Sequence, residues 1–160
     1  MKDSQLQIRI SEAQKAALKK SAQDSQMDLS SYVLAKLFKD PALQFEAKLG
    51  RLASHNRKYA LADLADYLNA LSPEELGRIF LKPWKTLLPA QLSNYVAAML
   101  ELSAHQKNLP TPKWLKNIEP DKEPYFGTDL KGLRLYLLKV SPPPFKARNI
   151  FIDTSIGGRI

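Results

Sequence analysis

The chain has 160 residues, of which 44% are hydrophobic and 25% charged, the balance of a folded soluble protein of about one domain. Its 24 Lys and Arg outnumber its 16 Asp and Glu, and the net charge of +8 favours a polyanionic partner such as nucleic acid. The absence of cysteine excludes disulfides, zinc ribbons and thiol catalysis, and it is typical of a cytoplasmic protein.

Residues 5–10 alternate strictly between polar and apolar side chains, which predicts a strand with one buried face. The apolar face carries Leu6, Ile8 and Ile10. The polar face carries Gln5, Gln7 and Arg9. Gln and Arg are the side chains that hydrogen-bond to adenine and guanine edges in the major groove of DNA. Taken alone, however, the strand favours a polar face that only contacts water.

Two helices are expected directly after this strand. Ser11 with Gln14 forms a capping-box pattern, which predicts a helix over residues 12–25. Its apolar stripe is rich in alanine and buries little area, so this helix is not expected to be stable alone. Asp28 is the expected N-cap of a second helix over residues 29–39, and Asp40-Pro41 ends it.

A single strand leaves its backbone groups unpaired, and the simplest solution is a second copy of the strand from another chain. The resulting homodimer would bury a set of apolar side chains from the strand and both helices. These are Leu6, Ile8, Ile10, Leu18, Leu29, Val33 and Leu37. The antiparallel ribbon formed in this way has a polar face that fits the major groove.

Residues 4–38 resemble the ribbon-helix-helix fold of Arc-like and CopG-like repressors and of many antitoxins. The likeness lies in Gln-Leu-Gln-Ile-Arg-Ile-Ser-Glu at 5–12 and Met-Asp-Leu-Ser-Ser-Tyr-Val at 27–33. The resemblance implies that Gln5, Gln7 and Arg9 read bases. It also implies that the backbone around Ser30 and Ser31 anchors a phosphate.

This chain departs from the family at two positions in the turn between the helices. Gln26 stands where the turn often has glycine, which suits the left-handed backbone better. Asp28 is a negatively charged cap that would lie near the phosphate, where serine is commoner.

Residues 41–109 are predicted to form a second, helical domain. Amphipathic stretches are expected at 43–52 and 59–71, a helix start at Ser72-Pro73, and the strongest helix at 89–106. The predicted fold class is therefore mainly α, with an N-terminal ribbon-helix-helix module at 1–40 followed by an α-helical module.

Residues 110–160 form a proline-rich segment with basic and aromatic side chains, predicted to be packed or partner-binding. The part at 110–128 is expected to be an ordered loop. The part at 129–140 fits either a helix or a strand, and we favour the helix, with Leu130, Leu133, Tyr136 or Leu137, and Val140 on its apolar face. The three prolines at 142–144 are expected to stop any regular element.

The tail that follows these prolines mixes basic and apolar side chains, and two interpretations stay open. It folds back onto the helical domain, or it is an arm that binds a partner. The candidate partner-binding residues are Phe145, Arg148, Ile150 and Phe151.

Several function classes have no support in the sequence. The first residues lack the apolar stretch of a secretory signal, and no apolar run is long enough to span a membrane, so we expect a cytoplasmic protein with no membrane partner. His55 and His105 are isolated, so no metal or other cofactor is expected. Asp63 and Asp66 are interpreted as the solvated face of a helix. No catalytic residues are recognised, and we expect no enzyme.

The favoured hypothesis is a sequence-specific autorepressor, the antitoxin of a toxin–antitoxin pair, that binds operator DNA as a homodimer. It would neutralise a cognate toxin protein through residues beyond 41. The alternatives are a plasmid or phage repressor without a toxin, and a structural or adaptor dimer that does not bind DNA specifically.

Overall fold

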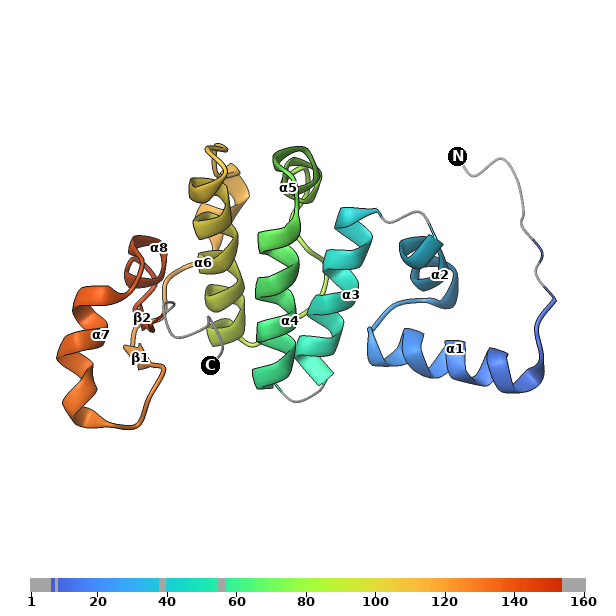
Figure 1. The fold of residues 1–160 in the computed structure, drawn as a ribbon, viewed down its shortest axis with the longest axis horizontal. Coiled ribbons are helices and arrows are strands. Elements are labelled where there is room, and N and C mark those ends of the chain that lie inside the picture. Colours follow the sequence, from blue (N-terminus) through green and yellow to red (C-terminus); the bar gives the residue numbers. More distant parts are fainter. Residues whose placement is uncertain (1–6, 8, 38–39, 55–56, 154–160) are drawn as a thin grey trace.

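The computed structural model describes residue 7 and residues 9–37, 40–54 and 57–153, and it is mainly helical (Figure 1). The first six helices are α1 (Glu12–Asp24), α2 (Leu29–Leu37), α3 (Pro41–Ser54), α4 (Arg57–Ala70), α5 (Pro73–Phe80) and α6 (Ala90–Gln106). The remaining elements are a 3-10 helix (Lys113–Asn117), β1 (Tyr125–Phe126), a 3-10 turn (Lys131–Leu133), α7 (Arg134–Val140), α8 (Pro143–Lys146) and β2 (Ile150–Phe151). The predicted mainly helical class is therefore confirmed.

Capping side chains fix where the helices begin. Before α1, the Ser11 hydroxyl accepts from Gln14 N–H at 3.2 Å and the Gln14 side chain accepts from Ser11 N–H at 3.0 Å. Ser72 and Glu75 form the same reciprocal pair before α5. Both helix starts were predicted from these residue types. In addition, Asp40 Oδ1 accepts from Ala42 N–H at 2.9 Å, so the Asp40-Pro41 pair that separates two helices also begins α3.

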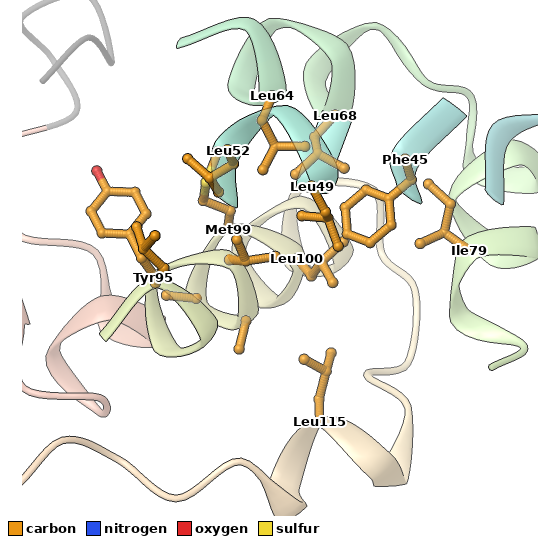
Figure 2. Packing of buried hydrophobic residues seen from close by; sticks show 14 of the residues in the cluster. Phe45, Leu49, Leu52, Leu64, Leu68, Ile79, Tyr95, Met99, Leu100 and Leu115 are labelled. Atoms are coloured by element: carbon orange, nitrogen blue, oxygen red, sulfur yellow. The ribbon is translucent and has the colours of Figure 1, made fainter. Parts of the chain in front are cut away.

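The hydrophobic core lies among α3, α4, α5 and α6, in the middle of the chain. Its fully buried side chains include Leu49, Leu52, Leu64, Leu68 and Leu100, which Figure 2 shows converging from three helices. Helix α4 packs against both α3 and α6. The segment after α6 closes one side, because Leu115 is fully buried in the same cluster.

Two tyrosines belong to this region: Tyr95 lies in the core and Tyr67 packs against it. The Tyr67 hydroxyl donates to the Pro41 carbonyl at 2.9 Å and so ties α4 to the start of α3. Burial raises the pKa of Tyr67, and the carboxylates of Glu75 and Asp40 raise it further. Burial also raises the pKa of Tyr95, with a smaller contribution from Tyr125.

The C-terminal segment folds back onto α6. Strands β1 and β2 pair in parallel, with Tyr125 opposite Ile150 and Phe126 opposite Phe151. The prediction that the three prolines stop any regular element is wrong, because Pro143 is the first residue of the short helix α8. A proline is tolerated at that position since the first helical N–H needs no partner within the helix. Helix α8 then packs against α6.

Residues 131–140 are helical, as favoured for 129–140. Of the two alternatives given for the apolar face, Tyr136 or Leu137, the buried one is Leu137, and the other predicted members of that face are wrong. Among the residues of α7 only Leu137 is buried. Leu130, Leu133, Tyr136 and Val140 are all exposed. Helix α7 lies against β2 at the edge of the structure, so only one narrow side of it is covered. Periodicity alone did not identify that side.

Candidate nucleic-acid interface

The candidate base-reading face lies at the start of the chain. Gln7 and Arg9 are exposed and have no regular secondary structure in the single chain. Gln5 lies outside the described residues, as do the predicted core residues Leu6 and Ile8. The segment runs directly into the capped first turn of α1, so the position of Arg9 is two residues from a fixed helix start.

The described part of the predicted dimer core is incompletely buried in one chain. Ile10 is 42% and Leu37 56% exposed, and the side chains of Leu18, Leu29 and Val33 are half-buried. Ala22 and Tyr32 are the buried apolar residues of α1 and α2. Sequence reasoning did not single out Tyr32, because its spacing fits both the core-facing and the solvent-facing side of α2.

The turn between α1 and α2 is a Schellman-type helix end. Met27 N–H donates to the Ala22 carbonyl at 3.0 Å and Gln26 N–H donates to the Gln23 carbonyl at 2.9 Å. Gln26 has a φ of 50°, the left-handed conformation that glycine adopts at lower cost. The sequence had identified this position as the one where glycine is usual.

The start of α2 is the candidate phosphate anchor. Asp28 caps this helix, since its Oδ1 accepts from Ser31 N–H at 3.0 Å. The amide of Ser31 is thus already engaged by a carboxylate, and a bound phosphate would have to displace it. Ser30 is exposed and Ser31 half-buried. The structure brings this anchor and the base-reading segment to the two ends of α1, within one chain.

The four candidate partner-binding residues of the C-terminal segment lie in the interior. Phe145 is 2%, Arg148 4%, Ile150 0% and Phe151 9% exposed. Of the two interpretations left open, the structure has the packed one. Phe145 and Ile150 belong to the hydrophobic core, Phe145 packs edge-on against Tyr95 of α6, and Phe151 stacks on Phe126 of β1. A partner cannot reach them without opening the fold.

Arg148 is the most highly bonded side chain of this segment. Its guanidinium pairs with both carboxylate oxygens of Glu101, at 2.7 and 3.3 Å. It also donates to Asn94 Oδ1 and to the carbonyls of Leu115 and Ile118, each at 3.0 Å. All of these groups belong to the same chain. The sequence left open whether this segment is buried. In the structure it is buried, and a complete set of acceptors stabilises the guanidinium there.

A cleft of about 730 Å³ lies between α2, α3 and the loop at 81–87. Glu46 closes its base: the carboxylate accepts from Lys85 N–H, Thr86 N–H and the Thr86 hydroxyl. These contacts hold the loop against α3.

The acidic residue Asp63 is ion-paired with Lys48 at 2.7 Å on the helix surface.

Within the described ranges, no group of three or more His, Asp or Glu side chains is arranged to hold a metal ion. None of the described helices is both long and apolar enough to cross a membrane.

Comparisons of the chain with protein-family models, with curated proteins and with solved structures gave no significant match.

Proposed function

We propose that the protein is a homodimeric, sequence-specific DNA-binding autorepressor of the ribbon-helix-helix type. The observation that carries the proposal is the exposure of α1 in the single chain: of its thirteen residues only Ala22 is buried. Ala13 and Ala17 of the predicted stripe are exposed. A helix of this length is marginal in water without tertiary packing. A second copy of the same segment would supply that packing.

The polar residues of this segment support contact with DNA. Arg9 and Gln7 are exposed immediately before a capped helix, and Arg and Gln are side chains that recognise guanine and adenine edges. Lys15, Lys19 and Lys20 are exposed along α1. They would strengthen binding to phosphates without regard to sequence, and they would make the affinity fall with salt.

The proposal includes a partner protein, as expected of an antitoxin in the cytoplasm. Helices α3–α6 and the C-terminal segment enclose a core to which the described side chains of α1 and α2 do not contribute. The part beyond residue 41 therefore has a core of its own, which supports a separate binding surface for a second partner. The same arrangement fits a repressor without a toxin, and the presence of a stoichiometric partner separates the two.

The test is a titration of the purified protein against the DNA upstream of its own gene, beside a scrambled duplex of equal length. Arg9→Ala should lose about 1–3 kcal/mol of binding free energy on the upstream DNA and relax specificity at one base. Lys122→Ala, which removes an exposed charge far from the N-terminus, serves as the matched control. It should keep the preference for the upstream DNA.

If Arg9→Ala and the wild type bind both duplexes alike, the segment at 5–10 does not read bases. The chain would then be a structural or adaptor dimer whose polar face only contacts water.

A further inference from the structure

Helix α7 and the turn before it form the largest group of exposed apolar side chains on one element of the described chain. We name it the α7 surface, made of Leu130, Leu133, Leu135, Tyr136, Leu138 and Val140. Leu135 is 75% and Leu130 65% exposed. Soluble proteins rarely leave such clustered apolar area in water unless a partner covers it.

The folding of the chain does not require these side chains to be apolar. Leu137 alone anchors α7 in the interior, where it is 5% exposed. Additional bonds hold the helix in place: the Tyr136 hydroxyl donates to Asp153 at 2.7 Å, and Ile152 N–H donates to the Ser141 hydroxyl at 2.8 Å. Leu137 and these polar contacts hold the seven-residue helix, and the exposed side chains of Leu135, Leu138 and Val140 are not needed for that.

The charges on the α7 surface indicate what covers it. Lys131, Arg134 and Lys139 lie among the apolar side chains, and the sequence has no Asp or Glu between 130 and 140. All three cations are exposed, and in the described part of the chain none of them pairs with a carboxylate. Arg134 stacks over Phe126 with its guanidinium carbon 4.8 Å from the ring centre, which holds it at the rim.

We infer that the α7 surface is the docking site for a partner protein that presents an apolar patch bordered by Asp and Glu. Charge complementarity favours this occupant, since three unpaired cations surround the apolar side chains. It disfavours a second copy of this chain, because two α7 surfaces would bring six like charges together. The inference rests on the proposed function only for the existence of a partner protein, and it places that partner at the end of the molecule opposite α1 (Figure 1).

The experiment begins with a photo-crosslinking amino acid, benzoylphenylalanine, at position 135 of the full chain in its own host. The crosslinked protein is identified by mass spectrometry, purified, and titrated against the purified chain. Two double variants are compared with the wild type: Leu135→Ser/Leu138→Ser, and Leu81→Ser/Leu87→Ser as a control. Leu81 is 77% and Leu87 90% exposed in the loop after α5, against 75% for Leu135 and 41% for Leu138, so the control removes two exposed leucines elsewhere.

The expected result is a stoichiometric complex with an acidic protein that the control variant binds as tightly as the wild type. The Leu135→Ser/Leu138→Ser variant should bind at least about tenfold more weakly. Arg134→Glu/Lys139→Glu should slow association and reduce its dependence on salt. Circular dichroism should show unchanged helix content for every variant, because the substituted side chains are exposed.

Three results would overturn the inference. One is a crosslink to another copy of the chain, with an association state that changes in the Leu135→Ser/Leu138→Ser variant. Another is flotation of the wild type, and not of that variant, with vesicles of phosphatidylglycerol. The third is a purified partner whose affinity is equal for both leucine variants. DNA binding by the same proteins is measured separately, so a partner that binds both leucine variants equally, with operator binding intact, refutes the α7 surface and not the DNA-binding proposal.

Discussion

Arg148 joins three segments of the chain that are far apart in sequence. Its guanidinium bonds to Glu101 and Asn94 on α6, to the carbonyl of Leu115 in the 3-10 helix, and to the carbonyl of Ile118 directly after it. With Arg148 itself following α8, these bonds fix the C-terminal segment against the helical core. A buried ion pair of this kind adds little to the free energy of unfolding by its own attraction. Removing one member costs more, because the other charge is left buried without a partner.

Arg148→Met should lower the free energy of unfolding by about 3–5 kcal/mol, because Glu101 and two carbonyls lose their donor inside the protein. The double variant Arg148→Met/Glu101→Leu should recover part of this loss, since it removes the unpaired carboxylate as well. Urea unfolding followed by circular dichroism measures both. Lys82→Met, at an exposed position, is the control and should change stability by about 0.5 kcal/mol or less. A double variant no more stable than the single one would show that the carboxylate is not the source of the cost.

Single residues differ in how far the sequence predicts their role. The capping box of Ser11 with Gln14 was predicted correctly because it depends on neighbours three residues apart, and the helix start at Ser72-Pro73 was predicted from the proline. Arg148 was not predictable in the same way. Its acceptors lie 30 to 54 residues away, so the basic, apolar composition of the tail fits a buried segment and an exposed arm equally.

At the scale of elements, the α1–α2 turn depends on a glycine of α3. A Cβ atom at Gly50 would lie 1.9 Å from the Ser25 carbonyl oxygen, which is backbone and cannot rotate away. The Ser54 hydroxyl, one helical turn after Gly50, donates to the Asp24 carbonyl at 3.0 Å. The N-terminal helices thus dock on α3 by direct backbone approach.

Gly50→Ala should lower the free energy of unfolding by about 1–3 kcal/mol, because the turn must move away from α3 to admit the methyl group. Gly77→Ala is the matched control: it also lies within a helix, α5, but a Cβ there meets nothing within 4 Å. That variant should gain about 0.5–1 kcal/mol, since alanine favours helix over glycine. Chemical denaturation distinguishes the two directions. A Gly50→Ala variant as stable as the wild type would mean that the turn does not pack closely on α3.

The elements themselves show where the sequence pattern suffices. The helices α3 to α6 were predicted near their observed positions, since long amphipathic stretches have one apolar side that a core must cover. Helix α7 has only seven residues and apolar side chains on nearly every side, so its pattern does not specify the buried one. In the structure Leu137, one of the two alternatives predicted for that position of the face, is buried, and Leu130, Leu133, Tyr136 and Val140 are exposed.

At the scale of the whole molecule, the helical core separates two incompletely covered ends. Helix α1 lies at one end and α7 at the other, with α3, α4 and α6 side by side between them (Figure 1). The two ends are suited to different partners: the first exposes small side chains and lysines, the second large apolar side chains with a basic rim. The separation would let the proposed DNA and the proposed partner protein bind at once.

If α1 is completed by a second chain, its stability must depend on protein concentration while that of the core does not. Hydrogen exchange of the full chain is then compared before and after a dilution of about a hundredfold. Amides of α1 should exchange faster after dilution, because the dimer dissociates. Amides in the middle of α6, where Val96, Ala97 and Leu100 are fully buried, should exchange at one rate at both concentrations. They are the internal control. Protection of α1 that is equal at both concentrations would show that packing on α2 and α3 is enough to hold it, and the argument for a dimer from its exposed face would fail.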